Sequence, residues 1–382
     1  MIEFKLPSLG ADMDEGTLLT WHVKPGDPVK RGQVVAVVDT SKAAVDVEIW
    51  NDGVLSELRV QPGEKVPVGT VLATLLEPGE VAAPAATVAS AKRRAISPSA
   101  RKRAKELGVD PESVQGTGGQ GAVTLADVEA AAHTLAAPTA AVAPAAAAID
   151  RQKEMRRAIA AAMSRSKREI PHYYLSEPIP MDKALTWLQK HNKGLAITER
   201  ILIAVLQLKA VALALQKFPQ LNGFYRDGEF HASSAVHTGV AIALRGGGLV
   251  APALHDVQAK SLEQLMRELT DLVKRARAGS LRSSEMSDPT ITVTNLGDQG
   301  VELVLGVIYP PQVALVGFGR ITERPWVQSG AVRVASMVTA TVAADHRVSD
   351  GHQGALFLAE LRDLLQQPEK LAEVGKAAGG KV

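Results

Sequence analysis

The chain has 382 residues, a length typical of two or three domains. Its 43 Lys and Arg nearly balance its 41 Asp and Glu, so charge gives it no general attraction to nucleic acid or to a membrane surface. It has no cysteine, which excludes disulfides and a catalytic thiol of its own and fits a reducing compartment.

The N-terminal residues run straight into a strand-like segment, with no signal-peptide pattern and no Arg/Ser-rich presequence. The longest apolar stretch, 201–215, is interrupted by Gln207 and Lys209 and falls short of the roughly 18 residues that span a bilayer. We therefore expect a cytoplasmic protein without a membrane anchor.

Residues 16–38 and 53–75 repeat one pattern, offset by 37 positions. Two copies are too few for a solenoid, and Pro-Gly turns between strand-like runs predict a small two-fold symmetric β domain. A glycine at the second turn of each half predicts a positive φ angle there. Nine of the 23 aligned pairs are identical: Gly16/Gly53, Leu18/Leu55, Val23/Val60, Pro25/Pro62, Gly26/Gly63, Val29/Val66, Gly32/Gly69, Val34/Val71 and Ala36/Ala73.

A hairpin is predicted between the two halves. Val45, Val47 and Ile49 alternate with acidic residues, as in a strand with one buried face, and an apolar run precedes them at 35–38. Lys42 is then at the hairpin tip. A lysine at such a tip is usually a solubilising charge, but the repeat places this one at the turn that the symmetry singles out.

Two Ala/Pro-rich segments, 78–94 and 132–149, divide the chain into predicted domains at 1–77, 95–131 and 150–382. Such segments bury too little apolar surface to fold alone and act as extended, semi-stiff spacers. At about 3.1 Å per residue the first would reach roughly 50 Å, which suits a tethered carrier that must visit distant sites.

The domain at 95–131 is predicted to contain two short helices, one starting at Ser97-Pro98-Ser99 and one capped by Thr124 with Asp127. About 35 residues is small for an independent core. Its basic residues lack the interleaved aromatics of a nucleic-acid-binding segment, so we expect no nucleic acid partner.

The C-terminal residues 150–382 are enough for one α/β core. Strand-rich segments with helices at both ends indicate a layered α/β fold and leave its topology open. Periodicity predicts helices in 155–166, 201–218, 261–278 and 354–365, and strands in 172–178, 240–244, 291–293, 313–318 and 332–342.

Two groups in this domain are candidates for catalysis. His346, in Asp345-His346-Arg347-Val348-Ser349-Asp350-Gly351, suits a general base because an imidazole has an ordinary pKa of about 6.5. Thr294 leaves a strand into a Gly turn and is the candidate hydroxyl, although either residue is commonly structural. The nine His have no metal-ligand spacing, and 246–248 lacks the Walker lysine, so neither a metal site nor a phosphate loop is expected.

The first two domains resemble parts of the dihydrolipoamide acyltransferase (E2) components of 2-oxo acid or acetoin dehydrogenase complexes. Residues 1–77 resemble the all-β lipoyl domain, a flattened barrel or sandwich, on the turn Asp39-Thr40-Ser41-Lys42-Ala43. This resemblance implies lipoate attached to Lys42; biotinyl domains have Met on both sides of the lysine instead. Residues 95–131 resemble the helical peripheral subunit-binding domain, which implies that Arg101, Lys102 and Arg103 bind a partner enzyme.

The C-terminal domain resembles the family's catalytic domain, which implies a chloramphenicol-acetyltransferase-like α/β fold. Carried over by position, His346 is the base, Thr294 supplies the oxyanion hydroxyl, and Asp350 orients the site or forms an ion pair. The family further implies homotrimers with sites between chains, which assemble into a larger core. The resemblance is carried by Met155-Arg156-Arg157-Ala158-Ile159, Ile170-Pro171-His172-Tyr173-Tyr174-Leu175, Gly248-Leu249-Val250-Ala251-Pro252, Thr294-Asn295-Leu296-Gly297 and Asp345–Gly351.

The expected reaction is transfer of an acyl group, acetyl in the first place, from S-acyl-dihydrolipoyl-Lys42 to coenzyme A. The expected partners are the thiamine-diphosphate-dependent E1 and dihydrolipoamide dehydrogenase, E3. Branched-chain acyl or succinyl transfer stays open, because 301–311 departs from the family's usual segment. The same domains could also belong to a non-catalytic organiser of the complex or to a biotin carrier; the intact His346 disfavours the organiser, and Ser41 with Ala43 disfavours the biotin carrier.

Overall fold

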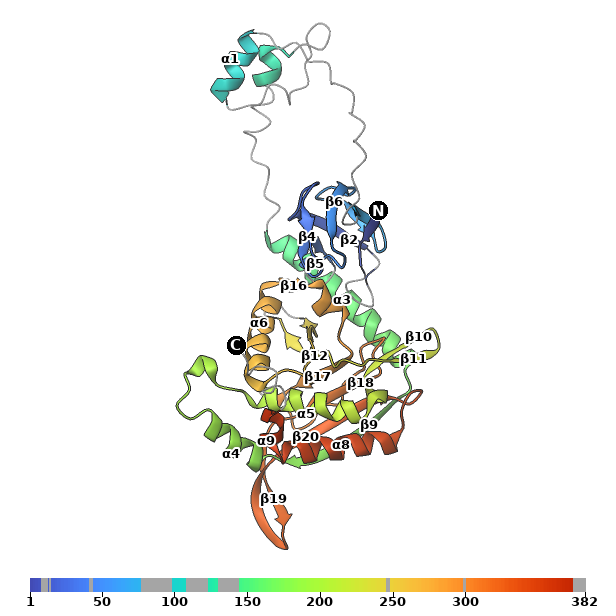
Figure 1. Ribbon diagram of the computed structural model, residues 1–382, viewed down its shortest axis with the longest axis vertical. Helices are drawn as coiled ribbons and strands as arrows, with labels where there is room; N and C mark the ends of the chain where they lie inside the picture. The colour runs from blue at the N-terminus through green and yellow to red at the C-terminus, as the bar shows by residue number, and fades with distance from the viewer. Residues whose placement is uncertain are drawn as a thin grey trace. The chain divides into compact units, whose positions relative to one another are not determined.

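A computed structural model describes residues 1–7, 13, 15–40, 44–76, 98–107, 123–129, 144–244, 248–297 and 300–373 of the chain. The chain divides into two compact units (Figure 1). One contains Met1–Glu80 and Arg151–Val382, and the other contains Val81–Asp150.

The N-terminal domain consists of two four-stranded sheets. One has the order β1 (Ile2–Lys5), β8 (Val71–Leu76), β6 (Gly53–Leu58), β3 (Pro28–Val29). The other has the order β5 (Ala44–Glu48), β4 (Val34–Asp39), β2 (Glu15–Trp21), β7 (Lys65–Pro67) and continues beyond β5 into β16 (Leu281–Arg282). A shift of 37 residues carries β2, β3 and β4 onto β6, β7 and β8, which confirms the two-fold symmetric domain predicted from the repeat.

The turns of the two halves are equivalent in detail. The backbone N–H of Gly26 donates to the carbonyl of Leu55, and that of Gly63 donates to the carbonyl of Leu18, each at 2.7 Å. Gly32 and Gly69, predicted to have positive φ, have φ angles of 80° and 87°. The halves also share one core, because Leu18 and Leu55 are buried together.

In the second unit, α1 (Pro98–Leu107) begins at the predicted proline. The Thr124 backbone N–H and hydroxyl both donate to the Asp127 carboxylate, at 2.8 and 2.9 Å, which confirms the predicted cap on the helical residues 125–129. α3 (Pro144–Glu169) begins at Pro144, so the last residues of the predicted 132–149 linker are helical.

The C-terminal domain is built on a mixed sheet whose order is β15 (Ala253–Leu254), β12 (Thr238–Val240), β17 (Ile291–Asn295), β18 (Ala314–Phe318), β20 (Ala331–Asp345), β19 (Thr322–Gln328). β9 (His172–Pro180) also pairs with β20. β17 is parallel to β12 and β18, and β20 is antiparallel to its neighbours β18, β19 and β9. The short hairpins are β10 (Gly223–Arg226) with β11 (Glu229–Ala232) and β13 (Ile242–Ala243) with β14 (Leu249–Val250).

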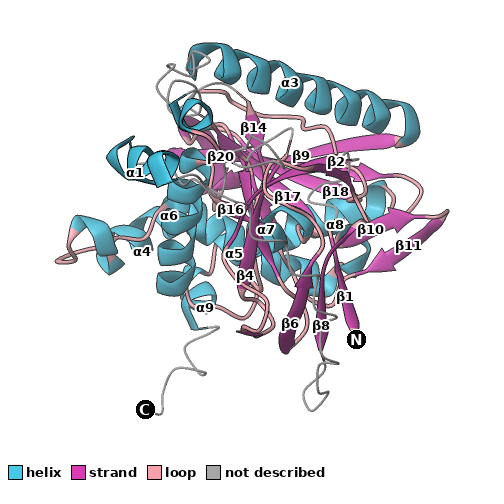
Figure 2. Cartoon of the chain, turned by 90° about the horizontal axis from the view of Figure 1, so that it is seen from above, coloured by secondary structure: helices cyan, strands magenta, loops and turns pink. Residues whose placement is uncertain are grey.

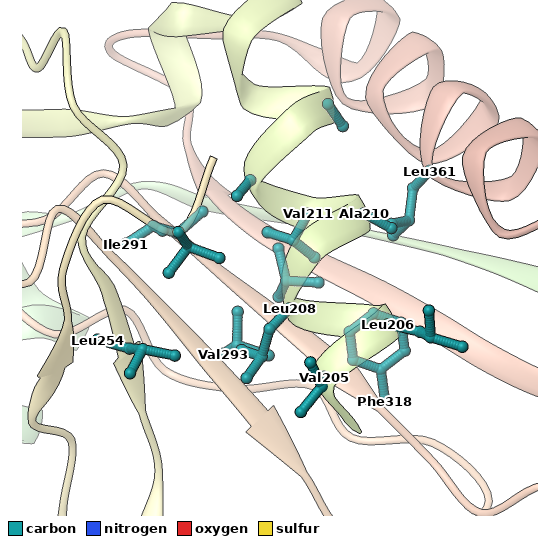
Figure 3. Packing of buried hydrophobic residues seen from close by; sticks show 14 of the residues in the cluster. Val205, Leu206, Leu208, Ala210, Val211, Leu254, Ile291, Val293, Phe318 and Leu361 are labelled. Atoms are coloured by element: carbon teal, nitrogen blue, oxygen red, sulfur yellow. The ribbon is translucent and has the colours of Figure 1, made fainter. Parts of the chain in front are cut away.

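The core of this domain lies between the sheet and the helices α5 (Ile203–Lys217) and α8 (Gly351–Leu365). Val205 and Leu208 of α5 pack near Val293 of β17, as Figure 3 shows. Figure 2 shows α3 on the other side of β9 and β20 from α5 and α8. The remaining helices are α4 (Asp182–His191), α6 (Leu262–Ala278), α7 (Ser283–Ser287) and α9 (Pro368–Glu373), and the 3-10 turns are 197–199 and 219–221. Among the described residues, no helix has the length and apolar character needed to cross a membrane.

The lysine in the middle of α5 is fully buried. Lys209 has 0% exposure, and its Nζ donates to the carbonyl oxygens of Val257, Gln258 and Lys260 at 3.2, 2.8 and 2.6 Å. These three bonds fasten the loop after β15 to α5. Burial lowers the pKa of Lys209 to about 8, because removing the ammonium group from water disfavours its charged form.

We expect the wild-type protein to gain stability relative to a Lys209→Met variant as the pH rises from about 8 to about 10.5. In this window the folded chain has lost the proton of Lys209 while the unfolded chain still binds it, so deprotonation favours folding. The gain approaches about 1.4 kcal/mol per pH unit. Urea denaturation across this range measures it. The exposed Lys183→Met variant should show no such trend, and identical pH profiles for both variants would contradict the assignment.

Candidate active site

His346 occupies the turn between β20 and α8, and the backbone of that turn is held on both sides. Its own N–H donates to the carbonyl of Pro171 at 3.0 Å. The N–H groups of Val348 and Ser349 donate to the carbonyl of Asp345, each at 3.0 Å. The imidazole is exposed and meets the edge of the Tyr173 ring at 5.4 Å between centroids. The side chain is therefore available to a ligand while its backbone is fixed.

An ion pair between the buried Asp345 carboxylate and the partly exposed Arg347 guanidinium stabilises this turn. Asp345 has 0% exposure, and its carboxylate accepts bonds from Arg347, at 2.9 Å from the backbone N–H and at 2.6 to 3.1 Å from the guanidinium. The carboxylate raises the pKa of Arg347 above its ordinary value, and the guanidinium also stacks 3.9 Å over the Tyr225 ring. Asp345 and Arg347 thus fix the backbone on either side of His346.

Asp350 begins the helix that follows. Its carboxylate accepts a bond from the backbone N–H of Gln353 at 3.0 Å, as an N-cap of α8. Its predicted role at the site, orienting groups or pairing with a charge, stays a prediction. The neighbouring Ser349 bonds the Tyr173 hydroxyl at 2.8 Å, which fixes the ring against His346. Burial raises the pKa of Tyr173, so the phenol stays neutral.

Thr294 lines a cavity of about 900 Å³. The cavity is mainly apolar, and its charged lining residues within the described chain are Arg165 and Arg226. Thr294 precedes Asn295, which donates to the Gln207 side chain at 2.8 Å and accepts from Gly297 N–H at 2.9 Å. This network holds the end of β17 and so positions the Thr294 hydroxyl at the cavity wall.

Thr294 and His346 of one chain lie at opposite ends of the β17–β18 strand pair. Thr294 is level with Gly317 of β18, and Gly317 is level with Thr341 of β20. His346 follows Thr341 by five residues, a rise of about 17 Å along the strand, with two strand spacings of about 4.8 Å between β17 and β20. The two candidate groups cannot meet within one chain.

A second histidine near the turn was not singled out as a functional candidate by its sequence. His172 is opposite Asp345 in the β9–β20 register. Its Nδ1 bonds the carbonyl of Ile170 at 2.8 Å and its Nε2 accepts from the Ile308 N–H at 3.1 Å, which requires the proton on Nδ1. Burial lowers the pKa of His172, so a neutral imidazole ties β9 to the segment at 308. The one signal for His172 in the sequence is that it belongs to 170–175, a stretch that resembles the acyltransferase family.

The remaining predicted site residues lie in the other domains. Lys42 is outside the described residues; the flanking strands β4 and β5 are paired, with Asp39 opposite Ala44. The structure does not describe the Arg101 side chain, and Lys102 is exposed. Arg103 donates to Glu129 at 3.1 Å, which joins α1 to the helical residues 125–129. Within the described parts of the chain, no group of three or more His, Asp or Glu is placed to hold a metal ion.

The model of the family described as 2-oxoacid dehydrogenases acyltransferase (catalytic domain) matches residues 147–373, which contain both Thr294 and His346. The chain belongs to this acyltransferase family. Residues 2–75 match the domain family described as biotin-requiring enzyme, and residues 94–129 match the e3 binding domain. The predicted order of a lipoyl-type β domain, a small binding domain and an α/β acyltransferase domain is therefore confirmed.

Related proteins match this acyltransferase over nearly its whole length. The dihydrolipoyllysine-residue acetyltransferase component of the pyruvate dehydrogenase complex of Zymomonas mobilis is 30% identical, over 96% of this chain and 98% of the relative. The counterpart from Staphylococcus aureus is 31% identical, over 98% and 99%. An Azotobacter vinelandii dihydrolipoamide acetyltransferase structure has a TM-score of 0.54 and 25% identity, over 57% of this chain and 90% of that one. In that enzyme a serine, a histidine and an asparagine were investigated for their role in catalysis, and the last two are four residues apart.

Removing the guanidinium that pairs with Asp345 should destabilise the acyltransferase domain strongly. We expect Arg347→Met to lower the free energy of unfolding by about 3 kcal/mol, because a carboxylate without exposure to water is left without its partner. Arg362→Met is the matched control, since its partner Glu177 is partly exposed and the loss should stay below about 1 kcal/mol. Urea denaturation measures both, and equal losses would mean that the Asp345 pair is no stronger than a surface pair.

Proposed function

We propose that this acyltransferase moves an acyl group, acetyl in the first place, from S-acyl-dihydrolipoyl-Lys42 to coenzyme A. One observation carries the proposal: the same domain places Thr294 at the wall of an apolar cavity and holds the exposed His346 on a turn whose backbone is fixed by hydrogen bonds. The whole-length relatives named as acetyltransferases of pyruvate dehydrogenase complexes support acetyl as the group. Of the three residue types investigated in the Azotobacter enzyme, His346 matches the histidine, and Thr294 supplies a hydroxyl in place of the serine.

The attachment of lipoate at Lys42 fits the flanking strands. Asp39 and Ala44 are directly opposite in the β4–β5 pair, so the residues between them close a short hairpin at the end of a sheet. Attached lipoate supplies a thiol that presents the acyl group as a thioester. A hairpin end lets that thioester extend away from the domain and into the cavity of an acyltransferase domain.

His346 and Thr294 have complementary tasks in the transfer. The imidazole of His346 removes the proton of the coenzyme A thiol, because the thiolate is the nucleophile. The Thr294 hydroxyl donates to the thioester oxygen as negative charge develops there. The imidazolium then returns its proton to the departing sulfur. No cysteine of the protein is needed, because both sulfur atoms belong to substrates.

Because Thr294 and His346 of one chain are separated by about 17 Å along the strands, we propose that each site combines two copies of the chain, in homotrimers that build a larger core. An exposed His346 with a fixed backbone suits insertion into a cavity of a neighbouring copy. Asp350, four residues after His346, has the spacing of the asparagine investigated in the Azotobacter enzyme, so we assign it to the same site.

The proposed partners are a thiamine-diphosphate-dependent E1, which acylates the carrier, and dihydrolipoamide dehydrogenase, which reoxidises it. The match of residues 94–129 to the e3 binding domain supports E3 as the ligand of the small domain. Three residues of the small domain, Arg101, Lys102 and Arg103, are proposed to bind the partner. Lys102 is exposed, whereas Arg103 already donates a hydrogen bond to Glu129. The complete lack of cysteine fits a reducing compartment, and we place the complex in the cytoplasm.

The carrier assignment predicts a defined mass change. Expressed in a host supplied with lipoate, the wild-type chain should gain the mass of one lipoyl group, and Lys42→Arg should gain none, because only an amine can form the amide. Intact-mass spectrometry measures this. A Lys42→Arg protein that still carried the added mass would rule out Lys42 as the attachment site.

The assignment of base and oxyanion donor predicts two separable losses of activity. His346→Ala should lower kcat for acetyl transfer from free S-acetyl-dihydrolipoamide to coenzyme A by about 10²- to 10⁴-fold. Thr294→Ala should lower it by about 10²- to 10³-fold. Gel filtration should show unchanged assembly for both variants.

Co-expression tests the two-chain site. Hybrids of His346→Ala and Thr294→Ala chains should recover activity, because some interfaces then combine an intact His346 with an intact Thr294. A mixture that stays as inactive as its components would contradict a shared site.

A further inference from the structure

Two strands with free edges meet outside the main sheet of the acyltransferase domain. The N-terminal domain, residues 1–77, is called the carrier domain below, and β5 is its outermost strand in the sheet that contains β2, β4 and β7. β16 has no other strand partner among the described residues. The two pair in parallel, with Val45 opposite Leu281 and Asp46 opposite Arg282. An open strand edge offers unpaired N–H and C=O groups, and a second strand can satisfy them by adding to the sheet.

A buried carboxylate anchors the same contact. Glu48, at the end of β5, is 6% exposed. Its Oε2 accepts bonds from the hydroxyl and the backbone N–H of Ser284, at 2.5 and 3.3 Å, and its own N–H donates to the Ser283 hydroxyl at 3.1 Å. A buried carboxylate is costly without hydrogen-bond donors. Residues 283–284 therefore form a specific binding site for Glu48.

Hydrogen bonds within the acyltransferase domain fix the binding site for Glu48. Glu285 is 5% exposed and forms two bonds with the Arg275 guanidinium of α6, at 2.6 and 2.5 Å. The same carboxylate accepts from the Arg282 backbone N–H at 2.8 Å. These bonds fix β16 and the start of α7 against α6, so the edge of residues 281–284 does not depend on the carrier for its shape.

The contact adjoins the cavity of the candidate active site. Met286 of α7 packs against the carrier-domain core and also against the acyltransferase core. The same Met286 lines the cavity that contains Thr294. A carrier domain held on residues 281–284 is therefore separated from this cavity by one helical turn.

We propose that Leu281–Ser284 is a docking strand for the carrier domain of the same chain, which joins it through β5 with Glu48 as the anchor. Docking holds the carrier beside the Thr294 cavity during acyl delivery, and this role rests on the proposed function. Two paired residues and one carboxylate form a small contact, which suits a carrier that must leave again for its other enzymes.

Cross-linking tests the docked geometry directly, because the chain has no cysteine of its own. Asp46→Cys with Arg282→Cys places two thiols at opposed positions of the strand pair, within disulfide range. The control is Glu57→Cys with Arg282→Cys, since Glu57 lies on β6 in the other sheet of the carrier. In the full-length protein, the first pair should form an intrachain disulfide at least about tenfold faster than the control. Equal rates, or disulfide-linked dimers in place of the intrachain product, would overturn the proposal.

Kinetics test whether docking serves acyl transfer. Glu48→Ala and Ser284→Ala should each slow transfer from the acylated, tethered carrier to coenzyme A by about tenfold, the effect of losing a hydrogen bond to a charged group. Transfer from free S-acetyl-dihydrolipoamide should stay unchanged, because it needs no docking. The exposed Glu57→Ala variant should leave both rates unchanged.

Lipoylation of the Glu48→Ala chain shows that its carrier domain is folded, and Ser284→Ala leaves the carrier untouched. Docking is refuted if the tethered rates match wild type, or if the tethered and free rates fall together. If the wild-type protein fails to transfer from the free substrate, the proposed function itself is wrong. If it transfers normally and the variants behave as wild type, only the docking proposal fails.

Discussion

The antiparallel pairing of β20 with β18 and β9 is the constraint on which the rest of the site depends. It sets Thr294 and His346 at opposite ends of the β17–β18 strand pair, because β17 is parallel to β18 and both run against β20. Neither end can shift, since a one-residue slip in register would turn every buried side chain of β20 to the other face. A single acyltransferase domain therefore keeps Thr294 and His346 apart.

The sequence was most informative where local chemistry and overall symmetry agree. The 37-residue repeat required glycines at equivalent turns, and the paired φ angles of Gly32 and Gly69 follow from it. The helix α6 was predicted because its buried residues recur at helical spacing, and α5 was predicted because its apolar stretch is long and almost continuous. The hairpin strand β19 was missed, since Pro325 and its mainly polar composition carry no strand signal. The second linker was predicted to extend to residue 149, but α3 begins at Pro144. The reason is that alanine favours helices and proline is a good first helical residue.

Side-chain partners were harder to predict than elements. The sequence does not show which partner the Asp345 carboxylate has, because only the fold buries this group and places the Arg347 guanidinium beside it. Lys209 read as an interruption of an apolar stretch, whereas its ammonium group lies in the core among three backbone carbonyls. That Thr294 and His346 act together is a proposal that rests on family resemblance. Their separation within one chain depends on strand register, which composition does not encode.

The near two-fold symmetry of the carrier domain leaves two equivalent edge strands that differ in charge. β1 occupies in its sheet the place that β5 occupies in the other, so the domain has two similar open edges. On β1, Glu3 and Lys5 neutralise each other at 2.9 Å, whereas β5 has Asp46 and Glu48 and no basic residue. The two edges offer the same backbone but different charge. A domain with nearly two-fold symmetry thus has two different edges, and the acidic one is β5, the strand that follows the turn containing Lys42.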